Sequence, residues 1–225
     1  APILGALVGY LAFWPVPIDP VVWGPAPAPK LEGTYAPNDR LLHVERFAVG
    51  GEAPESVAVD DQGVIYAGLA DGRVIKLDHN GAPLGDLART GGRPLGLAWD
   101  AGGNLIVADA EKGLLSISKT GALTVLSDGY HGRHFGIADD VDVGQSGRIY
   151  FSDASDKFRF HDFLLDLLEH RNNGALYVYD PATGETTLLL DDLQFANGVA
   201  VAADESYVLV VETGNYRVTR YWLAG

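Results

Sequence analysis

A short pattern of apolar and polar positions recurs four times along this chain. Each copy is an apolar run, a turn that bears Gly or Asp, and a second apolar run that ends near an acidic residue. The copies are SVAVDDQGVIYAGL (56–69), GLAWDAGGNLIVAD (96–109), DVDVGQSGRIYFSD (140–153) and GVAVAADESYVLVVE (198–212). Short apolar runs separated by turn residues are typical of paired strands. Each copy therefore predicts a hairpin.

Further apolar runs follow each hairpin and extend it to a unit of up to four strands. We expect third strands at 73–78, 113–118, 175–180 and 217–222, and fourth strands at 122–126 and 186–190. The residues that immediately precede or open the hairpins are Glu55, Leu95, Asp139 and Asn197. They are separated by 40 (55 to 95), 44 (95 to 139) and 58 (139 to 197) positions. Four-stranded units with a period of roughly 40–45 residues indicate a β-propeller.

The predicted fold class is therefore all-β, with about four propeller blades in residues 41–225. Propellers normally close with about four to eight blades. The last unit of the sequence stops within its third or fourth strand. We expect further blades beyond residue 225.

The longest spacing contains an insertion at 156–173 with a helical pattern. One face of the helix is predicted to consist of Phe163, Leu164, Leu167 and Leu168. Asp162 and Asp166 favour its start, and His170 and Arg171 favour its end. The helix is expected to pack on the third blade, either as a flap over one rim of the propeller or as a surface helix without a role.

The residues before the propeller divide into an uncharged segment, 1–14, and a Pro-rich linker and lead-in, 15–40. A bilayer span needs about 20 apolar residues, and no basic segment precedes this one as in a complete signal peptide. The interpretation we favour is the distal end of a signal anchor, with Trp14 and Trp23 at the membrane interface. The propeller would then lie on the extracytoplasmic or lumenal side. The alternative is a hydrophobic arm packed on the propeller itself.

Charge and composition exclude several function classes. Sixteen basic and 30 acidic residues give a formal net charge of −14, which opposes binding to nucleic acid phosphates and suits a cation. The chain has no Cys, so disulfides and thiolate metal sites are excluded. It has no Met, even at position 1, and we therefore expect a processed, trimmed or partial chain. No GxSxG, P-loop or HExxH motif is present.

The residues at the start of the four hairpins are expected to converge at the channel mouth, because the first strand of each propeller blade lines the channel. Glu55, Asp139 and Asn197 carry side-chain oxygens there, whereas Leu95 does not. Converging carboxylates repel one another unless a cation or a proton intervenes. Oxygen ligands suit Ca²⁺ or Mg²⁺ rather than zinc. The alternative is that each Asp or Asn bonds to the backbone of its own turn.

Two neighbouring side chains are candidates for activating water. Asp140 adds a carboxylate beside Asp139, and His134 lies a few residues before the third hairpin. Either could act as a general base next to a cation. The alternative for His134 is a loop histidine without a role. A second set, at the ends of the hairpins, is expected only to cap turns: Leu69, Asp109, Asp153 and Glu212.

The order of these motifs resembles that in the strictosidine synthase-like family, from about Leu31 to Gly225. The matching pieces are Pro54-Glu55-Ser56, ADGRVIKLD, GRPLGLAWD, ADAEKGL, IYFSDAS, the LLDLLEH insertion, and FANGVAVAADESYVLVVET leading to YRVTRYWLAG. This family is grouped with gluconolactonases, senescence marker protein and paraoxonases, so the resemblance implies a six-bladed β-propeller. The N-terminal segment resembles the membrane anchor of the adipocyte plasma-membrane-associated members.

The resemblance also implies site residues. In the lactonase relatives a calcium or other divalent ion lies at the channel mouth. Glu55 matches their first-blade Glu, and Asn197 matches the Asn of their Asn-Gly pair. Asp139 stands where many relatives have Asn, and its extra charge is expected to alter ion affinity or preference. Leu95 replaces a polar residue, so a substrate contact of those relatives is expected to be absent.

The function we favour is that of a divalent-cation-dependent hydrolase acting on a small-molecule lactone or aryl ester. One alternative is a condensing enzyme of the strictosidine synthase type, which performs a Pictet–Spengler reaction and would need a late-blade Glu beyond residue 225. The other is a non-catalytic, membrane-tethered propeller with a structural ion. The fold alone does not decide among them.

Overall fold

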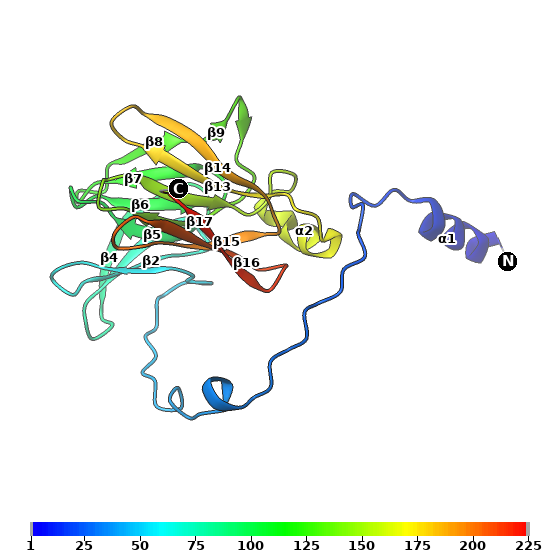
Figure 1. Ribbon diagram of the computed structural model, residues 1–225, viewed down its shortest axis with the longest axis horizontal. Helices are drawn as coiled ribbons and strands as arrows, with labels where there is room; N and C mark the ends of the chain where they lie inside the picture. The colour runs from blue at the N-terminus through cyan, green and yellow to red at the C-terminus, as the bar shows by residue number, and fades with distance from the viewer. Residues whose placement is uncertain (1, 224–225) are drawn as a thin grey trace.

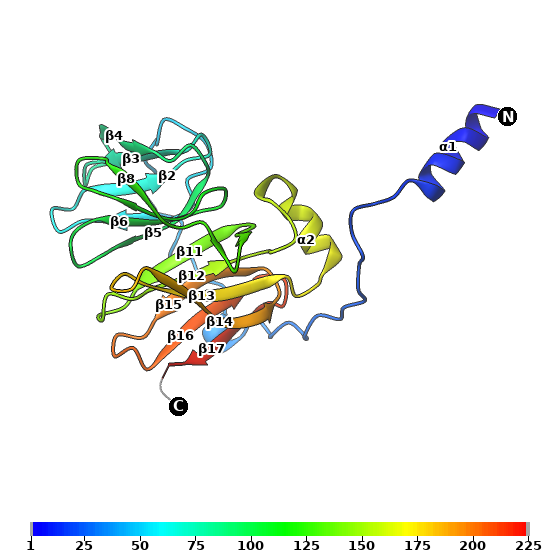
Figure 2. The same ribbon diagram turned by 90° about the horizontal axis from the view of Figure 1, so that it is seen from above.

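The computed structural model describes residues 2–223. Ala1, Ala224 and Gly225, which fall within the predicted ranges 1–14 and 41–225, lie outside the described residues. Four antiparallel sheets of three or four strands follow one another along residues 2–223, each built from consecutive strands (Figures 1 and 2). The innermost strands of successive sheets contact one another. This arrangement confirms the prediction of consecutive β-propeller blades.

The bounds of the strands agree closely with the predicted hairpins. The first blade contains β1 (Val57–Val59), β2 (Ile65–Gly68), β3 (Arg73–Leu77) and β4 (Pro83–Arg89). The second contains β5 (Pro94–Trp99), β6 (Leu105–Asp109), β7 (Gly113–Ile117) and β8 (Leu123–Ser127). The third contains β11 (Ala138–Val143), β12 (Ile149–Asp153), β13 (Gly174–Asp180) and β14 (Glu185–Leu193). The fourth contains β15 (Ala196–Val201), β16 (Tyr207–Glu212) and β17 (Arg217–Trp222).

Three strands were not predicted from the sequence. Strand β4 escapes a periodicity argument because Pro83 and Gly85 interrupt it, and its pairing with β3 shifts register twice. The other two, β9 (Gly129–Tyr130) and β10 (Arg133–His134), are only two residues long. They form a separate small hairpin between the second and third blades.

The hydrophobic core is divided among the spaces between neighbouring blades. Apolar side chains of the first and second, second and third, and third and fourth blades form three separate clusters. Phe151 is fully buried in the second of these, with its ring centroid 5.2 Å from Phe135 and 5.5 Å from Tyr177. Burial of one such side chain contributes roughly 1.5–3 kcal/mol. The blades are therefore held together face to face.

The predicted insertion is present as a 3₁₀ turn, η2 (Phe160–Asp162), followed by the helix α2 (Phe163–Glu169). It leaves the sheet after β12 and returns at β13, as expected. Phe163 and Leu167 pack against the core, but Leu164 and Leu168 are exposed. The prediction that all four apolar residues share a buried face is therefore wrong.

The reason is that polar residues occupy the rest of the buried side of α2. Asp166 accepts hydrogen bonds from Ser155 Oγ at 2.6 Å and from Asn173 Nδ2 at 2.9 Å. The buried Glu169 forms an ion pair with Lys157 at 2.5 Å. Because one oxygen of each carboxylate has partners, the helix can bury both side chains, although Asp166 Oδ1 and Glu169 Oε1 have no hydrogen-bond partner among the described residues. His170 ends the helix in the left-handed region.

The N-terminal segment contains the helix α1 (Pro2–Phe13) and then an extended chain with one 3₁₀ turn, η1 (Gly33–Tyr35). Both views show α1 apart from the propeller, on the side where α2 lies (Figures 1 and 2). Its apolar side chains, among them Ile3, Leu11 and Phe13, are exposed. Among residues 2–223, no helix combines the length and apolar character that a bilayer span requires.

Candidate functional site

The channel mouth is braced by the acidic residues at the ends of the second strands. Asp109 accepts a hydrogen bond from the Arg93 backbone N–H at 2.9 Å. Asp153 likewise accepts from the Ile137 N–H at 2.7 Å, and Glu212 accepts from the Gln194 N–H at 3.2 Å. Each bond joins the end of the second strand to the backbone just before the first strand of the same blade. The repeated acids therefore fix where the first strands begin.

These acids also form part of their own turns, as expected. Asp109 accepts hydrogen bonds from the Glu111 and Lys112 backbone N–H groups at 3.0 and 3.1 Å. Burial is the largest influence on Asp153 and raises the pKa of its carboxyl to about 7, although backbone N–H groups partly oppose the shift. The prediction of a turn-capping role is confirmed for Asp109.

Asp139 lies at the start of β11 and is only 5 % exposed. Burial raises the pKa of its carboxyl well above the usual value, and the charges of Glu55, Asp140 and Asp153 raise it further. The Arg93 guanidinium acts in the opposite direction. Among residues 2–223 no group donates a hydrogen bond to the Asp139 carboxylate. Its negative charge is therefore poorly compensated.

Glu55 and Arg93 form the polar pair beside Asp139. Arg93 Nη2 lies 3.3 Å from Glu55 Oε2 and donates to the Ala53 carbonyl oxygen at 2.9 Å. The Arg93 side chain is only 6 % exposed, whereas Glu55 is 46 % exposed. The guanidinium carbon lies 5.6 Å from the centroid of the Phe160 ring, in the insertion. Arg93 Nε and Nη1 are buried without a hydrogen-bond partner among the described residues.

Sequence reasoning missed Arg93. The available signal was a basic residue two positions before Leu95 in an acidic chain, in the motif GRPLG. Leu95 itself is buried with Ile137 and Phe195 beneath the insertion. The second blade therefore contributes a cation and an apolar side chain to the channel mouth, instead of an oxygen ligand.

Asn197 lies in β15, the inner strand that packs against β11. Its backbone carbonyl accepts a hydrogen bond from Ser152 Oγ at 2.6 Å. The residue is partly exposed, and its side-chain amide would supply the third oxygen donor beside the other two predicted ligands. Within residues 2–223, no three His, Cys, Asp or Glu side chains are grouped closely enough to hold a metal ion by themselves.

The chemistry of the channel mouth nevertheless fits a hard cation. Glu55 and Asp139 are both carboxylates, and the charge of Glu55 raises the pKa of Asp139. Asn197 would add an amide oxygen, and Ca²⁺ takes such a mixture of oxygen ligands. The unpaired, buried carboxylate of Asp139 is the feature that a bound cation would compensate. Arg93 supplies only part of that compensation.

Asp140 points toward the neighbouring blade. Its Oδ2 accepts a hydrogen bond from the Val199 backbone N–H at 2.8 Å, and its own N–H donates to Ser152 Oγ at 3.1 Å. Burial is the largest influence on its carboxyl and raises the pKa. Asp142 repeats the arrangement, with Oδ2 accepting from the Val201 N–H at 2.8 Å. Asp140 thus belongs to a ladder that joins the third and fourth blades.

His134 lies in the small hairpin, and its side chain is 70 % exposed. Its Nδ1 is 3.2 Å from the Asp128 carbonyl oxygen and 3.5 Å from the Asp128 carboxylate. Strand β9 of this hairpin contacts β14, the outermost strand of the third blade. The structure therefore places His134 at the periphery of the blade and does not bring it together with Asp139.

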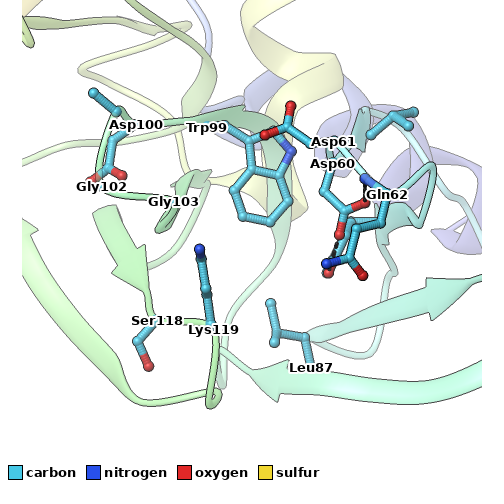
Figure 3. Close-up of a pocket in the computed structure, with 13 residues that line it drawn as sticks. Asp60, Asp61, Gln62, Leu87, Trp99, Asp100, Gly102, Gly103, Ser118 and Lys119 are labelled. Carbon is cyan, nitrogen blue, oxygen red and sulfur yellow. Dashed lines mark hydrogen bonds between the residues drawn. The ribbon is translucent and has the colours of Figure 1, made fainter.

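A pocket of about 590 Å³ lies at the opposite end of the first two blades (Figure 3). Its walls include Trp99, Lys119 and the acidic turns that follow β1 and β5. The Asp60 carboxylate is occupied by its own turn, since it accepts from the Gln62 and Val64 N–H groups, both at 2.9 Å. This pocket is separate from the channel mouth and contains none of the predicted site residues.

Consecutive antiparallel blades whose inner strands lie side by side define part of a β-propeller. A gluconolactonase from Xanthomonas campestris superposes with a TM-score of 0.64 over 78% of this chain and 60% of that chain, at 20% sequence identity. A calcium-binding protein, regucalcin, from Agrobacterium tumefaciens superposes with a TM-score of 0.56 over 76% of this chain and 54% of that chain, at 17% identity. These likenesses establish the fold.

The family follows from the sequence comparisons. The strictosidine synthase profile matches residues 139–225, and the profile of the strictosidine synthase-like N-terminal region matches 33–77. Protein STRICTOSIDINE SYNTHASE-LIKE 4 of Arabidopsis thaliana is 38% identical over 93% of this chain and 57% of its own length. The adipocyte plasma membrane-associated protein of Rattus norvegicus is 36% identical over 97% of this chain and 62% of its own length.

The chain belongs to the strictosidine synthase-like family. It spans a little over half the length of these curated relatives. The predicted resemblance and fold class are thus confirmed.

Proposed function

We propose that this propeller is a divalent-cation-dependent hydrolase of lactones or aryl esters, with its site at the channel mouth. The observation that carries the proposal is the state of Asp139, a buried carboxylate without a hydrogen-bond donor and beside a second carboxylate, Glu55. Burying such a charge is costly unless it is paired or binds a metal. A cation at this point would relieve that cost.

Glu55, Asp139 and Asn197 would hold the ion, Ca²⁺ or another hard divalent cation. When bound, such an ion polarises an ester carbonyl and stabilises the negative charge that develops on its oxygen. Support for this choice of ion comes from the chemistry of the three oxygen donors and from the calcium-binding protein among the structural neighbours.

Arg93 would orient the substrate. Its Nε and Nη1 groups are buried and unpaired among the described residues, so they can donate hydrogen bonds to an acyl oxygen without giving up another partner. Phe160 lies against the guanidinium and shields it from water. Leu95 would add an apolar surface, which suits the hydrocarbon part of a lactone or aryl ester. Asp140 and His134 take no part in this mechanism, because each is engaged elsewhere.

The proposal is tested by measuring the melting temperature with and without calcium, together with hydrolysis of a panel of lactones and aryl esters by the full-length protein. Asp139→Ala, which removes this oxygen ligand altogether, should abolish both the calcium-dependent shift and hydrolysis. Asp142→Ala is the matched control, since it removes a carboxylate on the same strand but away from the channel mouth, and it should retain both. Absence of a metal-dependent shift and of hydrolysis in the unmodified protein would refute the proposal.

A non-catalytic propeller with a structural ion is the second candidate. It is favoured by the positions of Asp140 and His134, which leave the described part of the channel mouth without an evident general base. The same experiment separates the two functions. A calcium-dependent rise in melting temperature without hydrolysis of any substrate would favour the structural ion.

We further propose that the chain is attached to a membrane through α1. The helix has no charged residue, and its apolar side chains are exposed in the structure. Exposed apolar surface of this extent is characteristic of an interaction site. One group of relatives is named for association with the plasma membrane. The attachment would be measured by co-flotation of the chain with phosphatidylcholine vesicles, and loss of flotation is expected after Leu7→Glu and Leu11→Glu are combined.

A further inference from the structure

The chain between α1 and the propeller is fastened to the insertion. Residues 19–23, which we call the strap, bond to the end of α2. The Val21 N–H donates to the Glu169 carbonyl oxygen at 3.0 Å. Arg171 reaches Asp19 twice, from Nη2 to the carboxylate at 2.6 Å and from Nε to the carbonyl oxygen at 2.7 Å.

An aromatic contact completes the attachment. The Trp23 ring lies 4.2 Å from His170 and 5.2 Å from Tyr216, measured between ring centroids. His170 directly follows α2, and Tyr216 precedes the last strand, β17. Aromatic pairs at such distances contribute roughly 0.5–1.5 kcal/mol beyond the area they bury. The strap is therefore held at two places by different kinds of contact.

The insertion presents an exposed apolar edge beside the strap. Leu164 is 59% exposed and Leu168 is 65% exposed. They are four positions apart on α2 and so lie on the same face of the helix. The opposite side of this helix is anchored through Phe163, whose ring centroid lies 6.4 Å from that of Phe195. The two leucines thus point away from the propeller.

The insertion also covers the channel mouth. Phe160 lies against the guanidinium of Arg93, and Phe163 and Leu167 pack on the cluster that contains Leu95. Figures 1 and 2 place α1 and α2 on the same side of the molecule. The exposed leucines, the strap and the channel mouth consequently belong to one face of the protein.

The length of chain before the strap limits how far this face can lie from α1. Trp14 follows the end of α1, and Asp19 begins the strap. Five residues span at most roughly 18 Å even when fully extended. This is less than the thickness of half a bilayer with its headgroups, roughly 20 Å. A surface that receives α1 must therefore lie close to α2.

We propose that the strap and α2 hold the channel mouth against the lipid surface to which α1 attaches, with Leu164 and Leu168 as a second apolar contact. The placement depends on the membrane attachment proposed above, and the choice of substrate that follows from it also depends on the proposed hydrolase activity. The site then opens toward the bilayer. Its substrates are molecules that partition into lipid, which suits the apolar side chains around Arg93.

The absence of Cys from the chain permits a direct test. Leu164→Cys and Leu168→Cys would each be labelled with an environment-sensitive fluorophore and mixed with neutral phosphatidylcholine vesicles. Emission at both positions should shift to the blue, and nitroxide-labelled lipid should quench it. Val59→Cys is the control, because Val59 is exposed at the far end of β1 from the channel mouth. Its emission should not change.

Two further measurements separate the possible failures. If the chain floats with vesicles but both labels on α2 remain in water, the second contact is refuted while the membrane attachment stands. If the chain does not float, the attachment and this inference fail together. Arg171→Ala removes both bonds to Asp19 and should weaken the signal at position 168 without loss of flotation. Arg148→Ala, which removes a surface ion pair with Asp180, should leave the signal unchanged.

Discussion

The carboxylate of Asp140 offers a sharp test of how the channel mouth is built. Asp140→Ala would remove the acceptor of the Val199 N–H, at 2.8 Å. Asp142→Ala would remove the equivalent acceptor of the Val201 N–H, also at 2.8 Å. Both bonds join β11 to β15, two residues apart on each strand. The second variant is therefore a matched control that lies farther from Asp139 along the same strand.

The expected loss of stability follows from these contacts. A hydrogen bond to a charged group contributes about 1.5–3 kcal/mol, and a buried N–H left unpaired costs about 1–3 kcal/mol. Burial raises the pKa of Asp140, so the cost of desolvating its charge offsets part of the gain. We expect each alanine variant to lower the free energy of unfolding by about 1–2 kcal/mol. Asp140→Asn should lose less, because the amide oxygen can still accept the hydrogen bond.

The assay is urea unfolding of the three variants and the unmodified protein without calcium, followed by tryptophan fluorescence. Similar losses in the two alanine variants, with hydrolysis by the folded protein retained, would support a structural role for both carboxylates. The reasoning would be refuted if Asp140→Ala abolished hydrolysis and left the unfolding midpoint unchanged. Asp140 would then be the general base considered from the sequence.

Three other predictions concern pH, packing and charge. The pKa of Asp153 is raised to about 7 in the folded chain. Its contribution to the stability of the folded state is therefore complete below about pH 4 and declines as pH rises through 7. Asp153→Asn should flatten this part of the stability profile measured without calcium. Phe151→Ala should cost about 3–5 kcal/mol in urea unfolding, whereas Val125→Ala on the exposed side of β8 should stay within about 0.5 kcal/mol. Arg93→Met should lower the melting temperature without calcium and enlarge the shift that calcium produces. The loss of stability should be smaller than the roughly 3–5 kcal/mol that follows when one partner of a buried ion pair is removed, because Glu55 is half exposed. An unchanged shift would contradict the charge argument.

The regular part of the fold is predictable because local signals and tertiary packing agree there. Each predicted hairpin has alternating apolar residues and a Gly- or Asp-bearing turn, and the structure pairs those runs, for example Ala58 with Tyr66. Strand β4 was missed because most of it is exposed and interrupted by Gly85. The local sequence of β4 does not predict a strand. The strand forms because it pairs with the edge of β3.

In the insertion, the spacing of apolar residues predicts the helix but not which of its residues are buried. The spacing of its apolar residues correctly predicts a helix, but the helix has only seven residues and two of its buried positions are acidic. Asp166 can be buried because Ser155 and Asn173 donate to it, from outside the helix. A sequence pattern does not reveal such partners. The exposure of Leu164 follows, since the core side was already filled.

The candidate site could be predicted only in part from the sequence, for a similar reason. The register of the repeats places Glu55, Asp139 and Asn197 at the start of inner strands. It does not say in which direction their side chains point. Whether a carboxylate faces the channel or the next blade depends on the neighbouring strand. Asp139 and Asp140 are adjacent in sequence, yet the first is left unpaired and the second bonds to Val199.

Arg93 and the two carboxylates at the channel mouth link ion binding to substrate binding. Arg93 faces the carboxylates of Glu55 and Asp139 but pairs only with Glu55, through Nη2. An ion held by Glu55 and Asp139 would compete with Arg93 for the Glu55 carboxylate. Loss of that bond would free a third donor on the guanidinium, next to Nε and Nη1. In the proposed mechanism Arg93, once released from Glu55, would be available to the substrate, so raising the calcium concentration should lower KM for hydrolysis in the unmodified protein but not in Arg93→Met.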